Sequence, residues 1–143
     1  MSGFSDVGIC DAFVFEPKLF GDERGYFFEL YRESLFRDRV HGPFVQFNQS
    51  RSSAGVLRGL HLQIKKPQGK FVTVLRGKIF DVALDCRKNS KTFGKHFSII
   101  LSEDENTSLY IPEGFAHGFC SLSNNTVMHY KCTNYVRINI HIS

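Results

Sequence analysis

Short segments of alternating apolar and polar residues follow one another along the second half of the sequence. The stretch KFVTVLRGKIFDVALDCR, residues 70–87, alternates, turns at Arg76 and Gly77, and then alternates again. The segments KHFSIILS, TSLYIP, HGFCSLS and TVMHYKCT follow it, with Asn124 and Asn125 as a hairpin turn between the last two. Because side chains of a strand point alternately to its two faces, this pattern predicts many short β-strands joined by tight turns.

Helical periodicity is nearly absent, which restricts the fold class further. The best helix candidate is residues 31–40, where Leu35, Phe36 and Val40 share one face. Many short strands with Gly and Pro turns predict an all-β antiparallel sandwich or barrel, because closure removes exposed strand edges. Residues 1–143 are expected to form a single domain, since 42% apolar residues with 15 Phe can fill one core.

The charged residues exclude some classes of partner. Lys and Arg number 18 against 14 acidic residues, a net charge of +4, and the basic residues are spread along the chain. This distribution predicts no nucleic-acid partner, although it suits a small anionic ligand held by a few cations. No apolar run approaches the ~18 residues that span a bilayer, so no membrane partner is expected.

The four cysteines indicate a reducing compartment. Cys10, Cys86, Cys120 and Cys132 show no C-x-x-C pairing, and each lies among apolar or strand-like neighbours. We therefore expect buried free thiols. No secretory signal opens the sequence, so a cytoplasmic protein is expected.

Two segments have the spacing of barrel metal motifs, but their ligands are incomplete. PEGFAHGF, residues 112–119, has the P-x-G-x-x-H spacing of the second cupin motif, with His117 as its histidine. In GVLRGLHLQ, residues 55–63, His61 is followed by Gln63 where the first cupin motif has a second histidine, and then by Lys65 and Lys66 where a carboxylate would stand. A divalent metal needs three or four N, O or S donors, so we expect no metal and no other cofactor.

Without a metal, His61 has two interpretations. A barrel histidine hydrogen-bonded to a neighbour is the commoner case. The alternative is a catalytic base, because Arg58 and Lys70 lie nearby among apolar residues, where buried cations are costly unless a ligand anion pairs with them. Nearby cations also favour the neutral imidazole, which is the form that accepts a proton.

Tyr130 is the possible acid. In VMHYKC it points to the same face as Met128, while His129 and Lys131 point to the other. A tyrosine is more often a core ring with a satisfied hydroxyl, so the catalytic interpretation requires that Tyr130 face His61 across the barrel.

Several of these segments together resemble one family of nucleotide-sugar enzymes. FEPKLFGDERGYFFE, FVQFNQSRS, GVLRGLHLQ, the stretch from Gln68 to Lys95, LYIPEGFAHGF and HYKCTNY resemble, in order and spacing, the dTDP-4-dehydrorhamnose 3,5-epimerase family. The resemblance covers about Phe15 to Tyr135 and implies a homodimeric, metal-free, cupin-like jelly-roll barrel. The implied substrate is a dTDP-linked 4-keto-6-deoxyhexose, epimerised at C3, C5 or both in deoxysugar biosynthesis of the dTDP-L-rhamnose type.

The resemblance also implies roles for individual residues. His61 matches the catalytic base, Tyr130 the proton donor, and Lys70 the lysine beside the keto oxygen of the sugar. The positions that match nucleotide- or sugar-binding residues of the family are Arg24, Glu29, Gln46, Asn48, Arg58 and His117.

Two departures from the family pattern keep an alternative open. Phe47 stands where the family usually has Asp, and residues 136–143 match neither the stretch that follows TNY in the family nor its C-terminal segment. That segment normally includes an aspartate paired with the base, for which Asp81 or Asp85 is a candidate substitute. The alternative function is therefore a diverged or truncated paralogue that binds a nucleotide sugar with weak activity, with activity at C3 alone, or with none.

Overall fold

The computed structural model describes residues 3–135, which form a two-sheet β-barrel. The all-β antiparallel class expected from the sequence is confirmed. The strands are β1 (Gly3–Asp6), β2 (Phe13–Glu16), β3 (Phe20–Asp22), β4 (Gly25–Phe27), β5 (Gln46–Ser52), β6 (Leu57–His61), β7 (Lys70–Arg76), β8 (Lys78–Asp85), β9 (His96–Ser102), β10 (Ser108–Ile111), β11 (Phe115–Ser121) and β12 (Thr126–Cys132). The helix α1 spans Glu33–Phe36.

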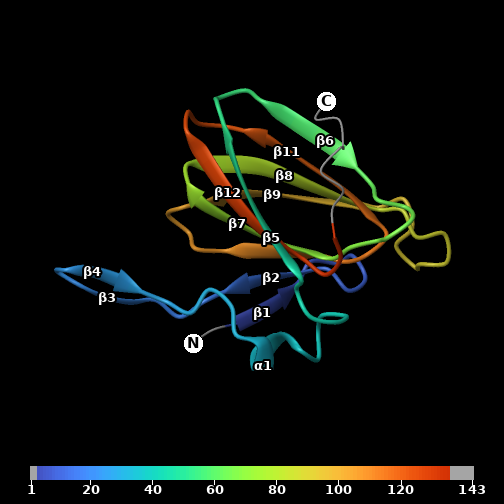
Figure 1. The fold of residues 1–143 in the computed structure, drawn as a ribbon, viewed down its shortest axis with the longest axis horizontal. Helices are drawn as coiled ribbons and strands as arrows, with labels where there is room; N and C mark the ends of the chain where they lie inside the picture. Colours follow the sequence, from blue (N-terminus) through green and yellow to red (C-terminus); the bar gives the residue numbers. More distant parts are fainter. Residues whose placement is uncertain (1–2, 136–143) are drawn as a thin grey trace.

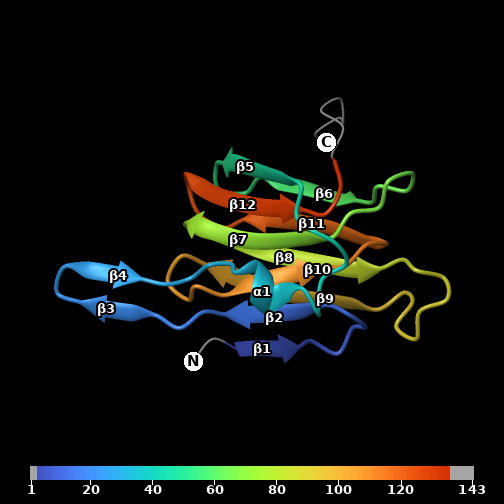
Figure 2. The same ribbon diagram turned by 60° about the horizontal axis from the view of Figure 1, so that its bottom comes forward.

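The two sheets pack face to face, and a separate hairpin projects from them. One sheet has the strand order β1-β2-β10-β7-β12-β5 and the other the order β6-β11-β8-β9, with antiparallel pairing throughout. The β3–β4 hairpin extends away from the barrel in both views (Figures 1 and 2). The strand order places β5 and β6 at edges of the two sheets, and the chain passes directly from one to the other.

Local sequence signals explain the tight turns. Gly77 alone joins β7 to β8 with a φ of 81°, and a Cβ there would lie 2.3 Å from the Oγ of Ser123. Asn125 has a φ of 54° in the turn before β12, a conformation that Asn tolerates better than most residues. The chain therefore turns at both predicted places. The hairpin predicted at Asn124 and Asn125 is wrong, however, because β11 and β12 lie in different sheets and do not pair with each other.

The main core lies between the two sheets, and an aromatic cluster lies outside the larger one. Val72, Leu109 and Met128 from the larger sheet meet Ile79 and Leu101 from the smaller sheet, all nearly or completely buried. The aromatic cluster consists of Phe13, Phe15, Phe36, Phe71 and Tyr110, together with Val40. These clusters account for much of the Phe content of the chain.

The helix predicted for residues 31–40 is shorter than expected. Helix α1 contains four residues, and no side chain caps its N-terminus at Arg32. Leu35 is exposed, whereas Phe36 is fully buried in the aromatic cluster and Val40 is nearly so. So short a helix has little intrinsic stability, and the burial of Phe36 holds it in place.

The cysteine prediction is only partly correct. All four thiols are free, but only Cys132 is fully buried, and the other three are partly accessible. Within the described part of the chain, no helix is long and apolar enough to cross a bilayer.

Candidate active site

The inner face of the larger sheet carries two rows of polar residues near its β5 edge. In one row, Tyr130 of β12 lies between Val72 of β7 and Asn48 of β5. In the next row, Cys132 separates Lys70 from Gln46. Side chains two residues apart on a strand share a face, so Tyr130 points into the barrel with Met128, while Lys131 points out against Phe47 and Phe71. The predicted facing of Tyr130 is thus confirmed.

The opposite sheet contributes Arg58 and His61 through a β-bulge. Residues three apart on a regular strand point to opposite faces. Here, however, His61 pairs with His117 and Arg58 pairs with Phe119, so Gly59 and Leu60 together oppose Gly118 alone. The extra residue turns Arg58 and His61 to the same side. Arg58 Nε reaches across to β5 and donates to the Oγ of Ser52 at 3.1 Å.

Gly59 allows β6 and β11 to approach closely at this bulge. Its φ is 99°, and a Cβ there would lie 2.5 Å from the backbone oxygen of His117. We expect Gly59→Ala to lower the free energy of unfolding by about 1–3 kcal/mol or more, because a disfavoured φ and a backbone clash add together. Turnover should fall as well, because a backbone shift that relieves the clash would displace His61 on the same strand.

Gly94→Ala is the matched control for Gly59→Ala. Gly94 also has a positive φ, 81°, but nothing lies within 4 Å of a Cβ at that position. Urea unfolding of both variants measures the difference. Equal losses of stability would show that the close approach at Gly59 has no cost of its own.

His61 is held in its neutral form. Burial, the Lys70 ammonium and the neighbouring His117 all lower its pKa below the ordinary value of 6.5. Its Nε2 atom is buried and makes no hydrogen bond to any of residues 3–135. A half-buried imidazole whose pKa is lowered, and whose Nε2 atom has no partner among these residues, can accept a proton from a ligand placed against it.

Lys70 and Tyr130 lie close together and have pKa values shifted in opposite directions. The Lys70 Nζ atom is 5.9 Å from the centroid of the Tyr130 ring. Burial lowers the pKa of Lys70, and Cys132 and Asp81 oppose that shift. Burial raises the pKa of Tyr130, and a hydrogen bond from Asn48 and the charge of Arg58 oppose that change. Perturbed ionisable groups that share one interior region are typical of active sites.

A buried contact between a histidine and a carboxylate supports the site from β8 and β11. His117 Nε2 and Asp81 Oδ2 are 2.8 Å apart, and Asp81 is fully buried. Asp85, also fully buried, instead binds Arg87, Ser90 and Thr92. Of the two candidate partners for His61, Asp85 therefore belongs to a structural network, and Asp81 reaches the site through His117.

Seven of the nine predicted site residues gather at this place, namely His61, Lys70, Tyr130, Gln46, Asn48, Arg58 and His117. Arg24 and Glu29 do not. Arg24 lies in the turn of the β3–β4 hairpin, where its side chain is 85% exposed and pairs with Asp22 at 2.7 Å. Glu29 follows the hairpin and pairs with Arg32. The β3–β4 hairpin extends away from the barrel (Figure 2), and both side chains pair within their own segment.

Two further residues of the site were not predicted. Cys132 lies beside Lys70, and Ser52 binds Arg58. The alternation of β12 could have indicated Cys132, which is two residues from Tyr130. Ser52 had no such signal, because its partner is brought to it by the bulge.

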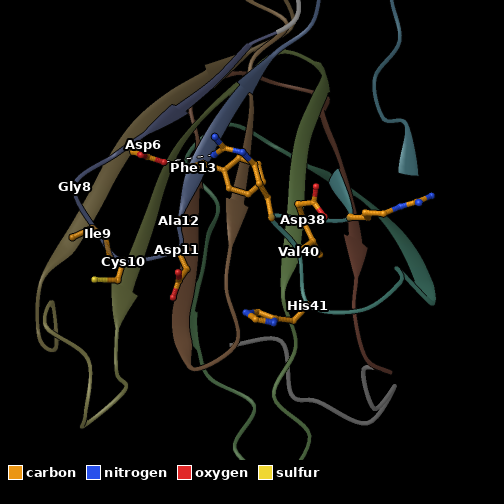
Figure 3. A pocket seen from close by; sticks show the side chains of 12 residues that line it. Asp6, Gly8, Ile9, Cys10, Asp11, Ala12, Phe13, Asp38, Val40 and His41 are labelled. Atoms are coloured by element: carbon orange, nitrogen blue, oxygen red, sulfur yellow. Dashed lines mark ion pairs between the residues drawn. The ribbon is translucent and has the colours of Figure 1, made fainter. Parts of the chain in front are cut away.

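A separate cavity lies away from this site. It has a volume of about 640 Å³ and lies between the β1–β2 turn and the segment after α1 (Figure 3). Asp6, Asp11, Asp38, Arg39 and His41 contribute its polar lining, and Arg39 pairs with Asp6 across 3.6 Å. None of the predicted site residues lines it. In residues 3–135, no group of three or more His, Cys, Asp or Glu side chains is arranged to hold a metal.

Comparison with known proteins places this barrel in a family. Residues 6–141 match the family model of dTDP-4-dehydrorhamnose 3,5-epimerase. The chain belongs to the dTDP-4-dehydrorhamnose 3,5-epimerase family. This confirms the resemblance noted in the sequence.

Relatives and solved structures of this family agree with the assignment. The dTDP-4-dehydrorhamnose 3,5-epimerase of Methanothermobacter thermautotrophicus is 50% identical over 131 residues, which are 91% of this chain and 71% of the relative. The Legionella pneumophila dTDP-6-deoxy-D-glucose-3,5-epimerase, solved with dTDP-4-keto-L-rhamnose, superposes with a TM-score of 0.92 at 44% identity over 96% of this chain and 74% of that one. A 3'-monoepimerase from Streptomyces bikiniensis, solved with dTDP-quinovose, gives a TM-score of 0.83 at 32% identity over 91% of this chain and 67% of that one.

Proposed function

We propose that this protein epimerises a dTDP-4-keto-6-deoxyhexose at C3, C5 or both, as a step in deoxysugar biosynthesis of the dTDP-L-rhamnose type. The observation that supports this most strongly is the meeting of His61, Lys70 and Tyr130 inside one barrel of this family. A base, a fixed cation and an acid are the groups that inversion next to a ketone requires.

In the proposed reaction, His61 removes the proton. A C–H bond next to the 4-keto group breaks, the proton moves to the imidazole, and the electron pair becomes an enolate whose charge lies largely on the keto oxygen. Lys70 stabilises that oxygen, because a fixed charge in a dry site acts strongly and needs no reorganisation. Tyr130 then donates its O–H proton to the same carbon from the opposite face, which inverts the centre and leaves a phenolate.

Both catalytic groups return to their starting states by exchange with solvent. The imidazolium of His61 loses its proton and the phenolate of Tyr130 regains one, so no co-reactant and no cofactor is needed. Arg58 is the inner-face cation best placed for the diphosphate, since Arg binds phosphate oxygens through two parallel hydrogen bonds.

The pH dependence of kcat/KM should follow these groups. It is expected to rise with pH through a pKa below 6.5, because His61 acts only when neutral and its pKa is lowered. At high pH, kcat/KM should begin to fall below pH 10.5, because the pKa at which Lys70 loses its charge is lowered. The pKa of Tyr130 is raised, so Tyr130 loses its proton later. In Lys70→Met the first pKa should move upward, because a cation that destabilises the imidazolium is gone. A first pKa at or above 6.5 in the unmodified protein would contradict the assignment of His61.

We also propose a homodimer in which the β3–β4 hairpin lies on the partner. Phe20, Tyr26 and Phe27 of the hairpin are 53–66% exposed, which is unusual for rings on a soluble surface. A two-fold dimer would cover these rings and bring Arg24 and Glu29 to the partner's site, which lacks both residues from its own chain.

Mixed dimers test this arrangement. Arg24→Ala and His61→Asn chains should each be nearly inactive alone. Refolded together, they should regain part of the activity, because one site of each mixed dimer combines an intact hairpin with an intact barrel. No recovery, or a monomer by light scattering, would reject the arrangement. We further propose a cytoplasmic location, which the four free cysteines support.

The stereochemistry of the product tests the reaction itself. Purified protein would be incubated with dTDP-4-keto-6-deoxyglucose, and the product examined by NMR. Inversion at C3 and C5, or at C3 alone as expected for a 3'-monoepimerase, supports the proposal. Binding of dTDP with no inverted product, measured by calorimetry, would instead establish a nucleotide-sugar-binding paralogue.

A further inference from the structure

Two side-chain amides form a chain on the inner face of β5, next to Tyr130. Gln46 Nε2 donates to the Oδ1 of Asn48 at 3.0 Å, and Asn48 Nδ2 points to Cys132 Sγ at 3.8 Å. Both amides are half-buried. Asn48 is paired directly with Tyr130 across the β5–β12 ladder, and Gln46 is paired with Cys132. Side chains opposite each other in such a ladder are in contact range.

The bond from Gln46 determines which end of the Asn48 amide faces β12. A carboxamide has one oxygen acceptor and one NH₂ donor group. Because the Asn48 oxygen is occupied by Gln46, its NH₂ group faces β12, where Cys132 and Tyr130 are its neighbours. The NH₂ group is therefore the end of the Asn48 amide that can donate to the phenol oxygen of Tyr130, and such a bond would oppose the rise in the pKa of Tyr130.

We propose that Asn48 is a positioning residue for Tyr130, and that Gln46 sets the orientation of the Asn48 amide. The NH₂ group of Asn48 donates to the phenol oxygen of Tyr130. The Tyr130 O–H group therefore does not donate its own hydrogen to β5. That hydrogen is directed into the barrel, toward the sugar. The inference rests on the proposed function, because it assigns a role within the same proton transfer.

The same bond also stabilises the product of the transfer. When the Tyr130 O–H bond breaks and a C–H bond forms on the sugar, the electron pair remains on the phenolate oxygen. A donor already aimed at that oxygen stabilises the new charge without rearrangement. The effect opposes burial, which raises the pKa of Tyr130 and would otherwise make it a poorer acid.

This role differs from the substrate contact that the family pattern suggests for Asn48 and Gln46. A substrate contact would affect binding and every chemical step together. A positioning residue for Tyr130 affects only the step in which Tyr130 acts. If reprotonation from Tyr130 fails, the enolate can still regain hydrogen from His61 on the original face, giving exchange with solvent but no inversion.

The first experiment measures two rates in D₂O, the formation of inverted product and the exchange of substrate hydrogen for deuterium. Both are measured for Asn48→Ala and Gln46→Ala. We expect the formation of inverted product to fall about tenfold or more for Asn48→Ala, as for loss of about one charged-group hydrogen bond. The His61-dependent deuterium exchange should change little. Gln46→Ala should show the same pattern more weakly. Gln49→Ala is the matched control, because Gln49 is an amide on the same strand that points outward, and both rates should stay unchanged.

The same substitutions in a Tyr130→Phe background separate the two roles. With no phenol to position, Asn48→Ala should have no further effect on exchange. A parallel loss of exchange and inversion, persisting in the Tyr130→Phe background, would overturn the proposal and support a substrate contact.

A second measurement needs no turnover. Protein labelled with ¹³C at tyrosine Cζ would be titrated by NMR, with the Tyr130 signal identified by its absence in Tyr130→Phe. In Asn48→Ala the pKa of Tyr130 should rise by about 0.5–1, the equivalent of one hydrogen bond to the phenolate. An unchanged pKa would overturn the inference even if the protein proved inactive. Absence of exchange in the unmodified protein would instead reject the proposed function.

Discussion

Replacing His61 with asparagine is expected to reduce turnover by about 10²–10⁴-fold, the usual contribution of a general base. Asparagine keeps a polar side chain of similar reach but cannot accept the proton. The fold should survive, because the Nε2 atom of His61 makes no hydrogen bond within residues 3–135. Turnover with dTDP-4-keto-6-deoxyglucose and the urea unfolding midpoint together measure the two effects.

His129→Asn is the matched control for this substitution. His129 also has a lowered pKa, but it lies on the opposite face of β12, against Phe47. Its replacement should leave turnover nearly unchanged. Comparable losses in the two variants would mean that the His61 effect arises from the fold and not from chemistry.

Replacing Lys70 with methionine is expected to lower turnover by about 10²–10³-fold, as for removal of one oxyanion-stabilising group. The free energy of unfolding should stay equal or increase, because methionine fills similar space without a charge. The desolvation of that charge is unfavourable and lowers the pKa of half-buried Lys70. Opposite effects on activity and stability are the signature of a group retained for function.

Lys131→Met provides the comparison. Lys131 is buried, whereas Lys70 is half-buried. The Nζ atom of Lys131 faces the rings of Phe47 at 5.1 Å and Tyr31 at 5.7 Å on the outside of the larger sheet. Turnover should be retained in this variant. A loss of activity in Lys70→Met that is matched by an equal loss in Lys131→Met, or by unfolding, would contradict a role for Lys70 at the keto oxygen.

The sequence predicted the strands better than it predicted their geometry. Alternation matches β8 and β9 best, because burial changes from residue to residue along both, as a period of two predicts. By contrast, β10 and β11 are buried at nearly every residue. The β6 bulge was not predicted. Strict alternation would send Arg58 and His61 to opposite faces, and only the two-against-one pairing around Gly59 brings both inside.

Local sequence patterns also could not predict which residues distant in sequence contact each other. Asp81 and Asp85 both point inward on β8, which the alternation of that strand could indicate. Which of them joins the site depends on cross-strand neighbours: Asp81 meets His117, while the loop after β8 surrounds Asp85 with Arg87 and Ser90. Similarly, family motifs included Arg24 and Glu29 in the site, but Arg24 lies in the turn of the projecting hairpin and Glu29 just after it, and each pairs with a neighbour in sequence.

Hydrogen exchange at the carbons beside the keto group tests the central claim most directly. Purified protein would be incubated with dTDP-4-keto-6-deoxyglucose in D₂O, and deuterium at C3 and C5 followed by NMR. We expect incorporation at one or both carbons, well above a protein-free sample, and its loss in His61→Asn. No incorporation above the protein-free rate, or equal incorporation with His61→Asn, would contradict it.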